Sequence, residues 1–304
     1  MPSIKAIKQR RTVVTNMKQA MKAMNLVATV KLRKSRERWG NTLPFLEGTD
    51  NIMLDAARSP ATASNIYVQE RDKSYKNTGY IVFTSDRGKC GSYNINICKA
   101  VLAHASANGK NAVLLPIGAR GMDFFLSQSQ NIHRQLGAMP ENPTYEDAEA
   151  MGFSVLADFC ALAEDGAPMP GEIDELYIAY TKFHTILSLE PTIKPVLPIS
   201  LRIEAEQAEN PMLAENTETP SMEYDPDVDS FLGYMAPMYL NTQIYGAMLE
   251  AALCEQAARM VATDTAVNNA EELIEDLTLL FNRQRQGIIT QEITEIVSGA
   301  SALT

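Results

Sequence analysis

The feature that most constrains this chain is a proline-free run over residues 243–297, close to the C-terminus. Large apolar residues recur in it at every seventh position, namely Leu253, Met260, Val267, Ile274, Phe281 and Ile288. A second series, also seven apart, consists of Leu249, Gln256, Thr263, Ala270, Leu277, Gln284 and Gln291. Two interleaved series of this kind are typical of a coiled coil. The predicted helix would span ~80 Å, which is more than a small domain needs.

A second long helix is predicted at the N-terminus, because residues 3–43 contain no proline. Its seam consists of Ile7, Val14, Met21 and Ala28, with Met17 and Met24 interleaved. Pro44 is expected to end or kink this helix, since proline lacks the backbone N–H that a helix needs. The methionines are interpreted either as buried seam residues or as an adaptable surface against partners, because their side chains are soft and unbranched.

Charge favours pairing of the two ends. Residues 1–38 carry eleven Lys and Arg against one acid, whereas residues 204–304 carry eighteen acids against three Arg. Exposed ion pairs contribute only about 0–1 kcal/mol each, so the apolar seam must supply most of the stability. We therefore expect the two ends to form one antiparallel rod, with a globular insert between them.

Composition argues against several classes of protein. A net charge of −10 argues against nucleic acid as the main partner. The cysteines lack the paired spacing of a metal site, which favours inert thiols in a reducing compartment; they are Cys90, Cys98, Cys160 and Cys254. The N-terminus lacks the apolar core of a signal peptide, and the longest uncharged stretch, 230–249, is too polar for a membrane span. We expect a soluble chain, which is compatible with a place on a membrane complex.

The middle of the chain predicts alternating strands and helices. Strands are expected over 65–69, 79–84, 112–117, 175–182 and 185–189, and helices over 93–107, 121–127 and 144–163. Thr144 and Asp147 form a capping-box pattern at the start of the last helix. The acidic, proline-rich segment 204–229 is expected to form a loop or hairpin, and Pro237 to break a helix that begins near Phe231.

The predicted fold class is therefore mixed α+β and α/β. It combines a long antiparallel coiled coil of the terminal helices with an inserted Rossmann-like α/β domain, whose sheet is mostly parallel. The predicted boundaries are 1–60 for the N-terminal helix, 61–205 for the α/β domain, 206–230 for the acidic loop and 231–304 for the C-terminal helix.

The glycine loop over residues 85–91, Ser-Asp-Arg-Gly-Lys-Cys-Gly, is the sharpest enzyme-like feature. A strand, a glycine turn and a helix N-terminus can bind a phosphate, but this loop matches neither phosphate-binding glycine motif. The alternative is a structural turn, with glycines at positive φ and Asp86 paired with Arg87. His104, His133 and His184 lack the spacing of a metal site, and the flanking motifs of a Ser-His-Asp or Cys-His enzyme are missing.

Three stretches of the chain carry more specific motifs. Near the N-terminus, Lys22-Ala23-Met24 precedes Leu-Val-Ala-Thr-Val-Lys-Leu-Arg-Lys at 26–34. Residues 84–94 read Thr-Ser-Asp-Arg-Gly-Lys-Cys-Gly-Ser-Tyr-Asn, and residues 289–300 read Ile-Thr-Gln-Glu-Ile-Thr-Glu-Ile-Val-Ser-Gly-Ala. Together they resemble the γ subunit of F-type ATP synthases, in which the first two patterns are T-K-A-M-x-M-V-A-A-x-K-L-R-K and T-S-D-R-G-L-C-G-G-L-N. Here Lys89, Ser92 and Tyr93 replace Leu, Gly and Leu. The regulatory cysteine pair of chloroplast forms is missing, which favours a bacterial chain.

The resemblance implies a rotor subunit of a proton-translocating complex, not a catalyst. The coiled coil would stand inside a ring of three α and three β subunits, with the α/β domain on the c ring and ε beside it. Proton or sodium flow through the c ring would turn the chain and drive ATP synthesis or hydrolysis on β, at the cytoplasmic face of a bacterial cell membrane. The resemblance implies no cofactor and no metal. It also implies rotor–stator contacts at Lys22, Met24, Arg259, Arg285, Gln286, Thr290 and Glu292.

Two other functions stay open. One is an α/β enzyme with coiled-coil arms that binds a phosphorylated ligand at the glycine loop, although a catalytic set is not evident. The other is a generic coiled-coil scaffold, which leaves the C-terminal block without a purpose. Co-purification with α and β subunits would separate the rotor from both.

Overall fold

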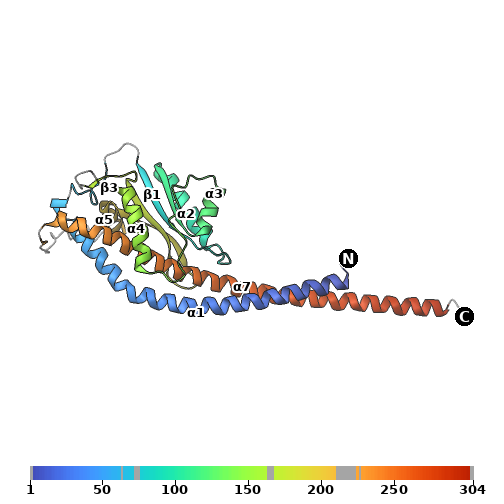
Figure 1. Ribbon diagram of the computed structural model, residues 1–304. Helices are drawn as coiled ribbons and strands as arrows, with labels where there is room; N and C mark the ends of the chain where they lie inside the picture. The colour runs from blue at the N-terminus through green and yellow to red at the C-terminus, as the bar shows by residue number, and fades with distance from the viewer. Residues whose placement is uncertain are drawn as a thin grey trace. The chain divides into compact units, whose positions relative to one another are not determined.

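The computed structural model describes residues 3–62, 64–71, 76–162, 168–209, 224–225 and 227–301. The chain forms two compact units, one of Met1–Val30 with Arg259–Thr304 and one of Lys31–Ala258. Two long helices, α1 (Ile4–Ala57) and α7 (Val228–Ser301), supply residues to both units. They are the blue and the orange-to-red ribbons of Figure 1. The predicted fold class, long terminal helices with an inserted sheet domain, is confirmed.

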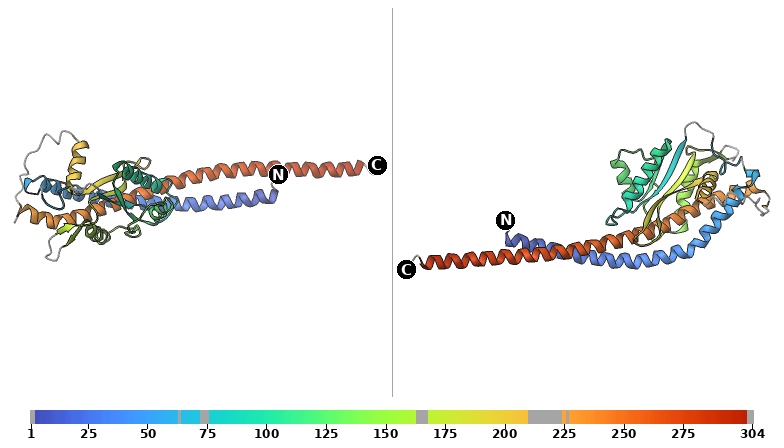
Figure 2. Two further views of the ribbon diagram at one scale, coloured as in Figure 1. Left: turned by 90° about the horizontal axis from the view of Figure 1, so that it is seen from above. Right: turned by 180° about the vertical axis from the view of Figure 1, so that it is seen from behind.

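The first unit is an antiparallel pair of helices. Low-numbered residues of α1 contact high-numbered residues of α7: Arg11 lies over the ring of Phe281, whereas Asn25 bonds to Met260. Figure 2 shows the two helices running side by side in both views. The prediction that the two chain ends pair is confirmed in this unit.

The second unit contains a four-stranded sheet. Its strands are β1 (Asn77–Phe83), β2 (Asn111–Ile117), β5 (Glu175–Phe183) and β6 (Leu189–Leu197), in the order β2-β1-β5-β6. β1 is parallel to both β2 and β5, whereas β6 is antiparallel to β5, so the sheet is mostly parallel as predicted. A smaller sheet pairs β3 (Cys160–Leu162) with β4 (Pro168–Pro170).

Helices cover both faces of the larger sheet. Alternation along β1 sends Tyr80 and Val82 to one face, and Ile81 and Phe83 to the other. α2 (Tyr93–Asn108) and α3 (Ala119–Ser127) pack on the first face. α4 (Tyr145–Phe159) packs on the second face, together with the parts of α1 and α7 that belong to this unit. Apolar burial therefore holds both long helices against the sheet.

Local signals mark two helix ends. α2 ends one residue later than predicted, before Gly109, whose φ of 60° is a left-handed conformation that glycine adopts without strain. At the start of α4, the Thr144 hydroxyl accepts a hydrogen bond from the Asp147 N–H, and the Asp147 carboxylate accepts one from the Thr144 N–H. The capping box is therefore confirmed. α4 ends earlier than predicted, because the chain passes after the buried Phe159 into β3.

The predicted strand over residues 65–69 is wrong. These residues form turns, in which the Val68 and Gln69 N–H groups donate to the Asn65 carbonyl. The Asn65 side chain also accepts from the Tyr67 N–H at 3.0 Å. An asparagine that bonds to the backbone two residues on favours a turn over an extended strand.

The predicted strand over residues 185–189 is also wrong. The N–H of Ser188 donates to the Thr185 carbonyl within a hairpin turn, and β6 follows at 189–197. Pro191 and Pro195 obscured this strand, because proline cannot donate to a sheet. They are tolerated since β6 lies at the edge of the sheet.

Neither Pro44 nor Pro237 ends its helix. The prediction that Pro237 breaks a helix is therefore wrong. Of the two outcomes expected for Pro44, a helix end is also wrong. Pro44 lies on an exposed face of α1, whose later turns are anchored by the fully buried Met53. Pro237 is flanked by Ala236 and Tyr239, which are also fully buried. Burial of the flanking turns outweighs the roughly 3 kcal/mol that a proline costs inside a helix.

Parts of the acidic segment are helical and not the predicted loop, although the described residues 224, 225 and 227 are outside any helix or strand. Residues 204–209 belong to α5 (Ile199–Glu209), in which Ile199 is fully buried and Glu206 lies 2.9 Å from Arg58. α7 already begins at Val228, and residues 210–223 and 226 lie outside the described residues. Within the described residues, none of the helices combines the length and the hydropathy that a transmembrane span requires.

Candidate functional site: the paired helices and the glycine loop

The apolar layers of the first unit come from the heptad series of the two helices. Ile7 and Val14 of α1 are buried together with Ala270 and Leu277 of α7. Each of these pairs is seven residues apart, as the coiled-coil pattern predicts. The layers stack along the pair, and the partly buried Leu273, Ile274 and Phe281 pack against them.

Polar residues occupy the second seam position of α1. Arg11, Lys18 and Asn25, each four residues after an apolar layer, contact α7. Met17 is 50% exposed and Met24 is half-buried. The prediction that Met17 lies in the seam is therefore wrong. A heptad seam alternates steps of three and four residues, and the step after each apolar layer of α1 is four, not three.

These polar residues connect the helices by directional contacts. The Asn25 amide donates to the Met260 carbonyl at 2.9 Å and to the Thr263 hydroxyl at 3.2 Å. Lys18 Nζ lies 2.7 Å from Glu271 Oε1. The hydrogen bond and charge of Lys18 hold the pKa of the Glu271 carboxyl below its usual value. The polar layers thus fix how the two helices face each other.

Beyond the N-terminus of α1, α7 continues as a single helix, as Figure 1 shows. Ile288 and Gln291, which the heptad pattern assigns to the seam, are exposed there. Ile293 and Ile296 are 56% and 71% exposed on the same segment. Apolar residues gathered on an exposed helix are typical of a surface that another protein covers.

The seven predicted contact residues fall into two groups. Lys22 and Met24 on α1 lie at the level of Arg259 on α7, because the neighbouring Asn25 bonds to Met260. Their exposure differs: Lys22 is exposed, whereas Arg259 keeps only 9% of its surface in contact with solvent. The second group is exposed and begins about 38 Å further along α7 at ~1.5 Å per residue. It consists of Arg285, Gln286, Thr290 and Glu292.

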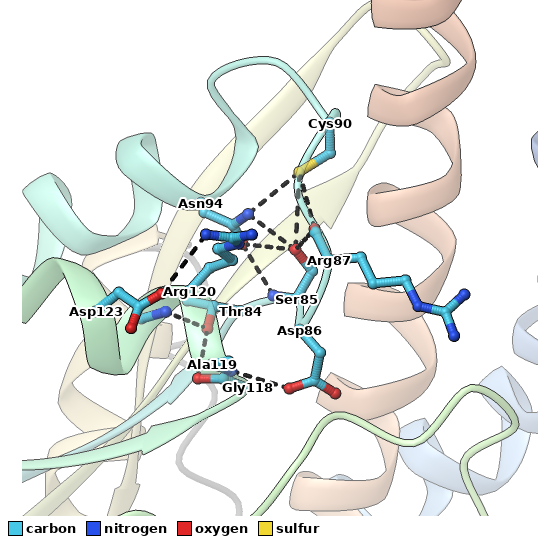
Figure 3. A network of polar contacts seen from close by, with 11 residues as sticks. Thr84, Ser85, Asp86, Arg87, Cys90, Asn94, Gly118, Ala119, Arg120 and Asp123 are labelled. Atoms are coloured by element: carbon cyan, nitrogen blue, oxygen red, sulfur yellow. Dashed lines mark hydrogen bonds and ion pairs between the residues drawn. The ribbon is translucent and has the colours of Figure 1, made fainter. Parts of the chain in front are cut away.

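The glycine loop bonds extensively within the chain, as Figure 3 shows. The Ser85 N–H donates to Asn94 Oδ1 at 2.9 Å. The Thr84 hydroxyl donates to the Ile117 carbonyl at 2.7 Å and accepts from the Gly121 N–H at 2.9 Å. These bonds connect the carboxyl ends of β1 and β2 with the starts of α2 and α3.

The Asp86 carboxylate occupies the N-terminus of α3, where a phosphate could otherwise bind. Oδ1 accepts from the Ala119 N–H at 2.9 Å, and Oδ2 accepts from the Met139 N–H at 3.0 Å. The expected pairing of Asp86 with Arg87 is therefore wrong, because both carboxylate oxygens bond to backbone, and Arg87 is exposed. The helix N-terminus favours this negative charge. Both carboxylate oxygens of Asp86 thus bond within the chain, which supports a structural turn.

Glycine is required where β2 meets α3. Gly118 has a φ of 86°, and a Cβ there would lie 2.3 Å from the Thr84 carbonyl oxygen. Within the loop, Gly91 has a φ of 59°, and Lys89 adopts a similar φ of 65°. The prediction of a glycine at positive φ is confirmed for Gly91.

Each histidine has a polar neighbour. His104 Nδ1 lies 2.9 Å from the Tyr80 hydroxyl, and burial lowers the pKa of His104. His184 Nε2 lies 2.6 Å from Glu190, and His133 Nε2 lies 3.8 Å from an aspartate carboxylate. In the part of the chain that the structure describes, no group of three His, Cys, Asp or Glu side chains is placed to hold a metal ion.

Sequence reasoning missed a buried ionic cluster that joins α1, α5, α7 and β6. The Asp50 carboxylate accepts hydrogen bonds from Lys194 at 3.1 Å, Arg202 at 3.0 Å and Tyr239 at 2.9 Å. Burial alone would raise the pKa of Asp50, but the two cations lower it below its usual value. No local motif could have indicated this cluster, because its members come from four elements far apart in the sequence.

Comparison with known proteins gives consistent matches over the whole chain. A family model described as ATP synthase matches residues 3–303. The ATP synthase gamma chain of Lachnoclostridium phytofermentans is 35% identical over 303 residues, covering 100% of both chains. The sodium ion specific ATP synthase gamma chain of Acetobacterium woodii is 35% identical over 310 residues, covering 99% of each. The gamma chain of Staphylococcus carnosus is 38% identical over 306 residues, covering 100% of both.

Solved structures share the fold. A chain in the OSCP/F1/c-ring structure of the Euglena gracilis mitochondrial ATP synthase gives a TM-score of 0.63 at 18% identity, covering 99% of this chain and 94% of that chain. A chain in the central stalk/c-ring structure of the Tetrahymena thermophila mitochondrial ATP synthase gives 0.59 at 24% identity, covering 81% and 99%. At these identities the likeness concerns the fold alone.

Proposed function

This chain belongs to the ATP synthase γ-chain family, and we propose that it acts as the central-stalk rotor of that complex. The observation that carries the proposal is the antiparallel pairing of the two chain ends, from which α7 continues alone. A shaft must resist bending and twisting, and a seam of stacked apolar layers with interhelical bonds supplies that stiffness. A single helix with exposed apolar residues supplies an end that partners can enclose.

In this proposal the chain itself makes and breaks no bonds. ATP synthesis and hydrolysis take place on the β subunits, and this chain changes their conformation as it turns. The internal bonding of the glycine loop supports this division, since Ser85 bonds to Asn94 and both carboxylate oxygens of Asp86 bond to backbone N–H groups of the chain. The partners are the ring of three α and three β subunits, the ε subunit and the c ring.

The proposed location is peripheral, at the cytoplasmic face of a bacterial cell membrane, with the c ring as the only membrane contact. The coupling ion is a proton or a sodium ion. One relative is named as sodium ion specific, whereas the other two relatives are named without an ion. In this scheme the paired ends, Met1–Val30 with Arg259–Thr304, form the rod, and the unit Lys31–Ala258 contains the α/β domain that would meet the c ring.

Two contact groups follow from the exposed residues. Arg285, Gln286, Thr290 and Glu292 would meet the β subunits at the far end of α7, where they are exposed. Lys22 and Met24, with Arg259 at the same level, would meet them lower on the rod. Because Arg259 is buried within the chain, a substitution there also changes the helix pair, and stability must be measured beside coupling.

The substitution Met24→Lys tests the lower contact. A charged, longer side chain at this half-buried position should change the surface that meets β while leaving the apolar layers in place. We expect the assembled complex to keep hydrolysing ATP but to lose ion pumping, with an unchanged melting temperature of the chain. Met24→Leu is the matched control and should pump normally, because the exchange conserves volume and polarity.

A Met24→Lys complex with normal hydrolysis, normal pumping and unchanged stability would contradict the contact assignment. The non-catalytic role has a separate test, since the isolated chain should show no nucleotide binding in a calorimetric titration. Stoichiometric binding of ATP would instead favour a ligand site at the glycine loop.

A further inference from the structure

Two side chains of α7 bond to the end of β5. Glu250 Oε1 accepts a hydrogen bond from the Phe183 N–H at 2.8 Å. The Cys254 thiol donates to the Thr181 carbonyl at 3.1 Å. Glu250 and Cys254 are one helical turn apart, so they face the strand from the same side of α7. Both are buried, at 8% and 0% exposure.

A third bond reaches the same turn of α7 from the start of α2. Tyr93, the first residue of α2, donates its hydroxyl to the Ala251 carbonyl at 3.1 Å. The Tyr93 ring is buried in a cluster with Cys90 and Cys254. Tyr93 replaces the leucine of the γ-subunit pattern, and a leucine could not donate this bond. We call residues 250–254 of α7, with these three bonds, the anchoring turn.

Hydrogen bonds oppose rotation of a helix about its axis, which apolar packing alone opposes only weakly. Burial of apolar area is non-directional, so a helix on an apolar face resists removal more than it resists rotation about its own axis. A hydrogen bond weakens steeply as its angle and length change, so three of them within one turn oppose both rotation and sliding. They are also buried, where water cannot easily replace a broken bond.

The inference rests on the proposed rotor function. We infer that Glu250 is a positioning residue, which keeps α7 from turning against the sheet so that torque enters the shaft at the anchoring turn. From this turn α7 continues as one helix to Ser301, so a rotation of the sheet is passed along the same helix. The side chain matters for its acceptor oxygen, which holds the N–H at the end of β5.

The charge of Glu250 is not what the role requires. Burial raises the pKa of the Glu250 carboxyl, whereas the hydrogen bond from the Phe183 N–H and the positive groups Lys182, His184 and Lys194 oppose that change. An amide oxygen could accept the same hydrogen bond from Phe183. Glu250→Gln should therefore preserve the function, whereas Glu250→Ala should not.

The test uses the complete complex in sealed vesicles. ATP synthesis driven by an ion gradient and ATP hydrolysis are measured on the same preparation, and the ratio of the two rates reports coupling. Losing one buried hydrogen bond makes slippage of α7 against the sheet about fivefold more favourable. For Glu250→Ala we therefore expect the ratio of synthesis to hydrolysis to fall about fivefold or more. For Glu250→Gln we expect a ratio within about twofold of the wild-type value, since the acceptor is kept.

A pair of cysteine variants separates position from stability. Cys254 and Cys98 are both fully buried, but Cys98 lies on α2 and not on the anchoring turn. Both Cys254→Ala and Cys98→Ala should lower the melting temperature of the chain, because each leaves a small cavity. Only Cys254→Ala should lower the coupling ratio.

Two results would overturn the inference while the rotor function stands. One is a Glu250→Ala complex whose coupling ratio equals that of the wild type. The other is a loss of coupling in both cysteine variants, in proportion to their loss of stability. If a complex that lacks this chain still couples ion flow to ATP synthesis, the rotor function itself is wrong. The inference then fails with it.

Discussion

The substitution Asp50→Ala probes the buried ionic cluster that holds α1 in the second unit. It removes the carboxylate that Lys194 and Arg202 contact, two side chains that are only 22% and 15% exposed. Removing one partner of a buried charge pair costs about 3–5 kcal/mol, because the remaining charges lose their compensation. For a unit of this size, this corresponds to a fall in melting temperature of roughly 6–20 °C.

Intrinsic fluorescence offers a local assay. Trp39 is the single tryptophan of the chain, and it lines a cavity of about 140 Å³ that Asp50 also lines. Unfolding in urea should be followed by this fluorescence and by circular dichroism in parallel. Asp55→Ala is the matched control, since Asp55 lies on the same helix with its side chain 42% exposed and 3.4 Å from Arg58. It should cost no more than about 1 kcal/mol.

The effect of Asp50 should depend on pH with a defined sign. Burial alone would raise its pKa, but Lys194 and Arg202 lower it below the usual value. A carboxyl with a lowered pKa contributes stability above its unfolded pKa of about 3.9, and this is lost as the pH falls through the folded pKa. The difference between wild type and Asp50→Ala should be complete near neutral pH and shrink below about pH 4. Equal stabilities of Asp50→Ala and Asp55→Ala, or a difference that stays constant in acid, would refute this reasoning.

Two further predictions concern the junction of β2 with α3 and the glycine loop that bonds to it. Gly118→Ala should destabilise the chain by about 2–4 kcal/mol, since its φ is positive and the new Cβ would meet the Thr84 carbonyl. Gly48→Ala is the control, because it lies in an open position of α1, and it should stabilise the chain by up to about 1 kcal/mol. Denaturation midpoints of Gly118→Ala and Gly48→Ala that shift in the same direction would contradict the geometry. Asp86→Ala should cost about 1–3 kcal/mol, because the Ala119 N–H and one other backbone donor lose their acceptor. A thermal melt unchanged by Asp86→Ala would show that water replaces the carboxylate there.

Periodicity made the paired helices predictable, because residues such as Val14 and Leu277 repeat every seven positions in the sequence. What periodicity could not show was the polar partner of each layer. Asn25 carries no signal by itself, and its role appears only when α7 brings Met260 opposite. The same limit explains why periodicity wrongly predicts Met17 in the seam, since the order of three- and four-residue steps depends on the partner helix.

Sheet prediction worked for strands with apolar, β-branched runs and failed where proline or asparagine intervened. β1 and β2 were found because their residues are buried on both faces. For β6 the sequence predicts a strand too early in the chain, over 185–189. Pro191 and Pro195 reduce the strand signal of the true range, although an edge strand accepts them. Pro237 by itself predicts a break in the helix, but flanking residues such as Tyr239 are fully buried and keep the helix intact.

The candidate site was predictable to the extent that it depends on local motifs. The glycine loop could be identified as a turn, but the bonds of Asp86 to Ala119 and Met139 join segments that are far apart in the sequence. The anchoring turn combines residues from α2, β5 and α7, none of which forms a motif. Such contacts follow from the sheet topology and are not visible before it.

Rotation of the chain inside its complex is the most direct test of the account. Leu187, 85% exposed at the turn between β5 and β6, can be changed to cysteine and labelled with a visible marker. The four native cysteines are buried, so the label should react with the new one. With the α and β subunits immobilised and ATP added, the account predicts that the marker turns steadily in one direction. A marker that stays still while ATP is hydrolysed would contradict the claim that the paired helices act as a rotor.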